Sequence, residues 1–147
     1  MGEIRKQYFF KASVSKAWDV WTNVEKYPEW VAGVSQSRIT SAVLQGPGFS
    51  WQEDAVFGVT PVQMDHRIES WEPLKKAVVE TSLPLGGKLH RELGFQETAE
   101  GAAVDILMRW DLGIAGSFFA PEYVHDVMEK NLELTVSNWK RRAEGGA

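Results

Sequence analysis

The sequence predicts an α+β fold, in which a strongly curved antiparallel sheet carries its helices on one side. Three observations predict this fold. One strand-like stretch near the N-terminus is followed by two short helical stretches. Six more strand-like stretches then follow at roughly ten-residue spacing with turn residues between them, which is typical of an antiparallel meander. The last long stretch has the periodicity of a helix, and it closes the chain.

The N-terminal part predicts one strand and two short helices. Residues 4–11 are rich in β-prone side chains and predict the first strand. Ser13 or Ser15 is placed to cap a helix over residues 15–24, whose apolar side chains form two adjoining rows. Pro28 predicts the start of a second short helix, because proline is tolerated in the first turn of a helix and not in its interior.

Six further strands are expected before the last helix. They cover residues 35–44, 49–57, 60–71, 77–83, 88–98 and 103–112. Alternate side chains of a strand share one face. We therefore expect His66 to point inward with Met64, and Glu53 to point inward with Trp51 and Phe57.

Residues 118–142 predict one long helix. A helix of roughly 25 residues spans about 38 Å, so we expect it to cross the whole domain. Its apolar arc includes Val127 and Met128, but Asn131 and Asn138 fall in the middle of that arc. An unpaired buried amide costs about 1–3 kcal/mol. Either these amides bond to the facing strands, or the helix roofs a cavity and supplies polar anchors to it.

Composition narrows the class of protein. The length of 147 residues fits a single domain over residues 1–147, and 44% hydrophobic with 24% charged residues is typical of a globular chain. The net charge of 16 − 20 = −4 makes nucleic acid a poor partner. We expect no integral membrane segment and no signal peptide, hence a cytoplasmic protein. Seven Trp and seven Phe are enough ring surface to line a pocket for an apolar or planar ligand.

Three stretches resemble one known family. Residues 17–30, AWDVWTNVEKYPEW, resemble the opening helix pair of the polyketide cyclase/dehydrase branch of the START-like, Bet v 1-like (SRPBCC) superfamily. Residues 69–73, ESWEP, are similar to its strand-to-turn signature, and residues 139–144, WKRRAE, to the end of its closing helix. The resemblance spans the whole chain. It implies a helix-grip fold, in which the sheet wraps around the C-terminal helix and encloses an apolar cavity for lipids, sterols, polyketides or other hydrophobic molecules.

His66 and Glu53 are the candidate catalytic residues. An imidazole on an apolar strand face is suited to acid–base chemistry near neutral pH, although a core histidine bonded to a backbone carbonyl is the alternative. An inward Glu53 would act as a base with a raised pKa, whereas an outward one would be an exposed carboxylate. His90 is expected near the cavity entrance and His125 in solvent. We expect no metal, because the histidines are unpaired in spacing and cysteine is absent, and no cofactor.

Three hypotheses of function remain open. The first is binding of a hydrophobic small molecule, such as a lipid, a polyketide or another aromatic or apolar metabolite, between the sheet and the last helix. The second is a polyketide aromatase/cyclase or dehydratase that uses the same cavity. The third, which follows from the resemblance, is a chaperone-binding interaction domain. A monomer or a homodimer fits each of them.

The cavity would be lined by apolar and aromatic side chains with a few amides. The candidate ligand-binding residues are Trp30, Trp51, Phe57, Met64, Met108, Trp110, Tyr123, Val124, Val127, Met128, Asn131 and Asn138. Val127 is expected over the cavity. Trp139 is expected against the first strand and the first helix.

Overall fold

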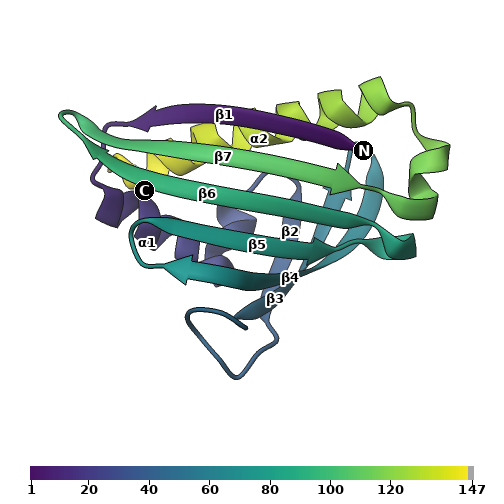
Figure 1. Cartoon of the computed structure of the whole chain (residues 1–147), viewed down its shortest axis with the longest axis horizontal. Coiled ribbons are helices and arrows are strands. Elements are labelled where there is room, and N and C mark those ends of the chain that lie inside the picture. Colours follow the sequence, from purple (N-terminus) through teal and green to yellow (C-terminus); the bar gives the residue numbers. More distant parts are fainter. Residues whose placement is uncertain (146–147) are drawn as a thin grey trace.

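The computed structural model describes residues 1–145 and shows a seven-stranded antiparallel sheet wrapped around a long helix (Figure 1). The elements follow in the order β1 (Gly2–Phe10), α1 (Val14–Thr22), η1 (Val24–Glu29), β2 (Val34–Ile39), β3 (Ser50–Phe57), β4 (Thr60–Glu72), β5 (Lys76–Ser82), η2 (Pro84–Gly86), β6 (Lys88–Thr98), β7 (Gly101–Asp111), η3 (Gly113–Phe118) and α2 (Pro121–Ala143). The predicted fold class is confirmed.

The strand order across the sheet is β1-β7-β6-β5-β4-β3-β2, so the two strands that flank the first helices form opposite edges. The segment with α1 and η1 therefore crosses from one edge to the other. Register shifts between Val34 and Gln36 in β2, and between Ile68 and Ser70 in β4, mark bulges. Bulges bend a strand, and the bend helps the sheet to curve around α2.

The first helix closes one end of the molecule. The Ser13 hydroxyl caps α1 by accepting a hydrogen bond from the Lys16 N–H at 3.2 Å, as one of the two expected caps. On its buried side Trp18 contacts Trp71 and Phe95 edge-on, with ring centroids 4.9 and 5.1 Å apart. The second expected helix is a 3₁₀ helix, η1, and Pro28 lies near its end and not at its start.

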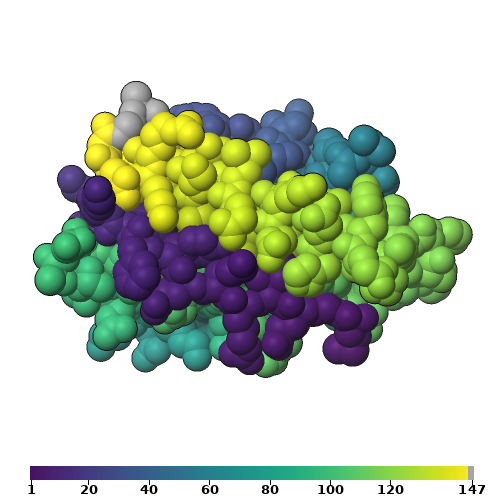
Figure 2. All heavy atoms as spheres, turned by 90° about the horizontal axis from the view of Figure 1, so that it is seen from above, coloured from purple at the N-terminus to yellow at the C-terminus, as the bar shows by residue number. Residues whose placement is uncertain are grey.

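The last helix is shorter at its N-terminus than expected. Residues 113–118 form the separate 3₁₀ helix η3, and α2 begins at Pro121, where a proline fits the first turn. Trp139 is 2% exposed, packs edge-on against Phe10 of β1 at 4.9 Å, and donates a hydrogen bond to the Ala17 carbonyl of α1. Figure 2 shows α2 and β1 side by side on one face of the molecule.

The second strand is also shorter than expected. It ends at Ile39, and the following residues 40–49 leave the sheet as a loop, visible in Figure 1 as the projection beyond β3. The Ser41 hydroxyl accepts the Ser50 N–H at 2.9 Å, which ties the loop back to β3. Across residues 1–145, no helix is both long and apolar enough to cross a membrane.

Candidate functional site

A cavity of about 470 Å³ lies between α2 and the inner face of the sheet. Its wall is formed mainly by apolar side chains of β3, β4, β6 and β7, and η1 contributes Tyr27. The helix α2 forms the roof through side chains spaced by three or four residues. These are Met128, Asn131, Leu132, Thr135, Val136 and Trp139.

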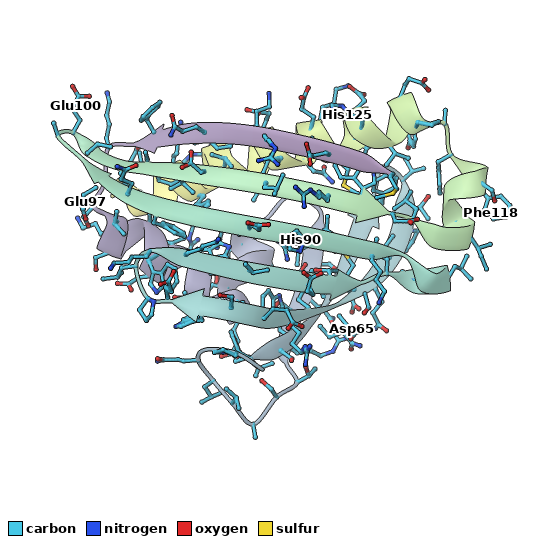
Figure 3. All side chains as sticks on the ribbon, in the orientation of Figure 1. Asp65, His90, Glu97, Glu100, Phe118 and His125 are labelled. Carbon is cyan, nitrogen blue, oxygen red and sulfur yellow. The ribbon has the colours of Figure 1, made fainter. Side chains whose placement is uncertain are left out.

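The cavity reaches the surface at the end formed by η2, η3 and the turn between β3 and β4. Leu85 and Phe118 line it there, and both are exposed. Figure 3 places Phe118 at this end, opposite Glu97 and Glu100 near the β6–β7 turn. Phe57 packs edge-on against Phe119 with centroids 5.8 Å apart. A hydrophobic molecule entering at this end would therefore meet apolar side chains first.

Four neighbouring strands place a polar group each at the inner face of the sheet. Glu53 comes from β3, His66 from β4, Thr81 from β5 and Arg91 from β6. His66 and Thr81 are directly paired across β4 and β5. Glu53, His66 and Arg91 line the cavity, and Glu53 and His66 are 4% and 3% exposed. We call these four residues the polar cluster.

The contacts of His66 fix its tautomer. The Thr81 hydroxyl lies 2.6 Å and the Arg91 Nη2 3.1 Å from His66 Nδ1. A guanidinium is only a donor, so Nδ1 accepts and the ring proton sits on Nε2. Burial lowers the pKa of His66, and the nearby Arg91 charge lowers it further against the opposing effect of Glu53. His66 is therefore neutral near pH 7.

Glu53 is ionised, which corrects the expected raised pKa. Burial raises the pKa of this carboxyl, but the N–H of the neutral His66 ring 3.0 Å away, the charge of Arg91 and a hydrogen bond from Trp51 together hold it below its usual value. Trp51 Nε1 donates to Oε2 at 2.7 Å, and His66 Nε2 lies 3.0 Å from Oε1. The expectation treated the cavity as purely apolar. Instead, His66, Arg91 and Trp51 lie beside Glu53, and together they reverse the direction of the pKa shift.

Half of the candidate ligand-binding residues line the cavity. The lining ones are Trp30, Phe57, Met64, Met108, Met128 and Asn131. The others lie outside the lining, and they are Trp51, Trp110, Tyr123, Val124, Val127 and Asn138. That the lining residues bind a ligand stays a prediction.

The aromatic residues outside the lining have structural contacts of their own. Trp51 stacks on His66 with centroids 5.0 Å apart. Trp110 packs near His125 at the edge between β7 and α2. Tyr123 is partly exposed and contacts Phe57 near the cavity opening.

The expected position of Val127 over the cavity is wrong. The residues that face the cavity are centred on Leu132 and Thr135, so Val127 and Asn138 fall on one flank of α2. The Asn138 side chain donates to the Trp30 carbonyl at 2.9 Å. The Asn138 amide is therefore bonded to protein, but to the residue that caps η1 and not to a facing strand, as the first explanation expected. Asn131 lines the cavity.

His90 is also corrected. Because Arg91 faces the cavity, its neighbour His90 points to the outer face of the sheet, where Figure 3 labels it. There it contacts the carboxylates of Glu80 and Glu92, the second at 2.8 Å. These side chains raise its pKa, although burial opposes them. Within the described residues no group of three His, Cys, Asp or Glu is arranged to hold a metal ion.

Arg91 and Thr81 were not among the site residues predicted from the sequence. The signal for Arg91 was present in the sequence. Arg91 lies on the same strand face as Leu89, Leu93 and Phe95, at every second position, and those three residues are buried. A charged side chain in an otherwise apolar row predicts a buried polar site. Thr81 carried no such signal, since a threonine is common in strands.

The comparisons with known proteins agree with this geometry. The family described as polyketide cyclase / dehydrase and lipid transport matches residues 1–144. No curated protein matches the sequence. Solved structures share the fold at low identity. Zhui aromatase/cyclase from Streptomyces sp. R1128 is 16% identical over 99% of both chains, with a TM-score of 0.77.

Two further structures have similar scores. A START superfamily protein from Mycobacterium smegmatis is 10% identical over 97% of both chains, with a TM-score of 0.81. Ara h 8.0201 is 12% identical over 99% of both chains, with a TM-score of 0.78. At these identities the likeness shows the helix-grip fold alone. The match over residues 1–144 shows more: this chain belongs to the polyketide cyclase / dehydrase and lipid transport family.

Proposed function

We propose that the protein binds a hydrophobic small molecule in the cavity between α2 and the sheet. The main support for this proposal is the cavity itself. It has a volume of about 470 Å³, mostly apolar walls and an opening bordered by Leu85 and Phe118. Ligand sites in proteins have volumes of roughly 300–1,000 Å³ and combine apolar walls with a few polar groups. The polar cluster supplies those groups here. The family description, which names lipid transport and polyketide chemistry, supports the same class of ligand.

Native mass spectrometry of the freshly purified protein tests this proposal. We expect a fraction of the protein to carry the mass of an apolar metabolite, and extraction to release it. Displacement of the neutral dye Nile red by added lipids is the second measurement. A protein that carries no small molecule and takes up neither Nile red nor any lipid would overturn the proposal.

A second candidate is polyketide aromatase/cyclase activity in the same cavity. The buried contact of Glu53, His66 and Arg91 favours it, because a charged and a titratable group beside an apolar ligand are suited to chemistry as well as to binding. The cavity would hold a poly-β-keto chain in a folded shape close to ring closure. Positioning of this kind accelerates a reaction without a dedicated nucleophile.

The variant His66→Gln separates catalysis from binding. Glutamine keeps hydrogen-bonding capacity but cannot transfer a proton, so turnover of a poly-β-keto substrate should fall by roughly 10²–10⁴ if His66 acts as an acid or base. Affinity for the same molecule should change only a few fold. If the variant instead unfolds more easily and keeps its turnover, His66 is a structural residue of the core.

A further inference from the structure

Within residues 1–145, three buried N–H groups on the cavity wall have no acceptor with hydrogen-bond geometry. They are Nε1 of Trp30, Nε2 of His66 and Nε of Arg91. His66 Nε2 lies 3.0 Å from the Glu53 carboxylate, but its N–H is not aligned well enough on that oxygen to form a hydrogen bond. A buried donor without an acceptor is costly, and native proteins usually satisfy such groups.

All three groups can only donate a hydrogen bond in this environment. An indole N–H and a guanidinium N–H only donate, and the two donors at His66 Nδ1 leave the ring proton on Nε2. Tyr27 links the groups in space, with its ring 5.2 Å from Trp30 and 6.1 Å from Trp51. Trp51 in turn stacks on His66 at 5.0 Å. This end of the cavity therefore offers donors and calls for an oxygen acceptor.

The charges beside these donors are already balanced. Among the described residues that line the cavity, Glu53 carries the negative charge and Arg91 the positive one, and no other Asp, Glu, Lys or Arg lines it. A bound carboxylate would place a second negative charge beside Glu53 in a site of low dielectric, where like charges repel strongly. A neutral oxygen accepts the same hydrogen bonds without that repulsion.

We propose that the polar cluster selects a neutral apolar molecule that carries a carbonyl oxygen, and discriminates against the matching carboxylate. This inference rests on the proposed function, because it names the class of ligand for the same cavity. The apolar part of the ligand lies along Met64, Met108 and Leu132, and its oxygen is held by donors of Trp30, His66 or Arg91.

Two isosteric probes test the inference on the unaltered protein. Methyl undecyl ketone and lauric acid have the same undecyl chain on a carbonyl carbon. The other group on that carbon is a methyl group in the ketone and a charged oxygen in the ionised acid. At a pH where lauric acid is ionised, we expect the ketone to displace Nile red at a concentration about tenfold or more below that of the acid. Methyl laurate distinguishes a lipid-type ester from a ketone as the source of the carbonyl. Both carbonyl probes should bind more tightly than tridecane, which has no oxygen.

The outcomes separate the two proposals. Equal or tighter binding of lauric acid overturns the selection of a neutral head group, and equal binding of tridecane overturns the role of the oxygen; in both cases the hydrophobic site itself stands. Failure of every probe to displace the dye, or of the dye to bind, overturns the proposed function and this inference with it.

A charge variant gives an independent measurement. Glu53→Gln leaves the Arg91 charge uncompensated, so the affinity for lauric acid should rise about tenfold while that for the ketone changes less than about threefold. Asp54→Asn is the matched control, because it removes a carboxylate from the opposite face of the same strand, where Asp54 pairs with Arg38. It should leave the preference unchanged. An unchanged preference in folded Glu53→Gln, checked by circular dichroism, overturns the inference; the comparison of probes on the unaltered protein needs no variant.

Discussion

Replacing Leu132 by tryptophan tests whether the space beneath α2 is available to a ligand. Leu132 lies at the midpoint of α2, is 9% exposed and forms part of the cavity roof. A cavity of roughly 150 Å³ holds a benzene molecule. The ring atoms that tryptophan adds at this position need about the same volume. The added indole would therefore occupy about a third of the 470 Å³.

The same numbers predict the size of both effects. A ligand bound with micromolar affinity gains about 8 kcal/mol. Loss of about a third of its contacts costs about 2.7 kcal/mol, which is roughly a 100-fold loss of affinity. The free energy of unfolding should fall by less than about 1 kcal/mol, because the indole enters existing space. In a close-packed core the same insertion would cost about 1–3 kcal/mol or more.

Urea melts and titration with methyl undecyl ketone measure the two quantities on one protein preparation. The matched control is Leu134→Trp, the same change two residues along α2 at a side chain that is 53% exposed and outside the cavity lining. It should alter neither quantity. Leu132→Trp with full affinity, or with a loss of several kcal/mol of stability, would refute the argument, because either result means that the interior beneath Leu132 is already packed.

Two further predictions concern stability. Trp139→Ala should lower the free energy of unfolding by about 3–5 kcal/mol in urea melts, because it removes a buried indole. Trp139→Phe loses the hydrogen bond to Ala17 but keeps a ring, so it should lower the free energy of unfolding by clearly less. Equal losses in the two variants would contradict the claim that ring packing is the larger contribution. The pKa of His90 is raised by Glu92 and Glu80 despite its burial, so its stabilising contribution is complete below its ordinary pKa of about 6.5 and is lost as pH rises through the raised value. The unaltered protein should exceed His90→Gln in stability by at most about 1 kcal/mol at about pH 5–6, where a histidine is charged and ordinary carboxylates are ionised. A difference that grows as pH rises from there would show the sign to be wrong.

Much of the fold was predictable because periodicity within one segment depends only on that segment. Turn residues separated the strands, and alternation placed His66 and Glu53 on the inner face, where both are buried. Boundaries were less predictable where a tertiary contact ends an element. The loop of residues 40–49 follows a strand that the sequence pattern would have extended, and its tie to Ser50 comes from a neighbour in space.

The chemistry of the site was less predictable for a related reason. Alternation gives the face of a side chain but not its neighbour on the next strand, which depends on register. Trp51 is the partner of His66 across β3 and β4, so Glu53 meets His66 diagonally. Without that register and without Arg91, the pKa of Glu53 was expected to rise. The helix shows the same limit, since a broad apolar arc did not fix which of its flanks faces the sheet.

The contacts of the polar cluster also bear on the choice between binding and catalysis. A general base must have a free lone pair and a pKa near the working pH. The Nδ1 lone pair of His66 is taken by Thr81 and Arg91, and the pKa of Glu53 is held low, so neither group is a strong base as it stands. What the cluster does offer is N–H donors and a guanidinium, which stabilise negative charge on an oxygen as it develops. Ring closure in this cavity would therefore depend on polarisation of a carbonyl and on positioning. Both need the neutral, oxygen-bearing ligand that simple binding also needs, so the ligand preference should be measured before any turnover is sought.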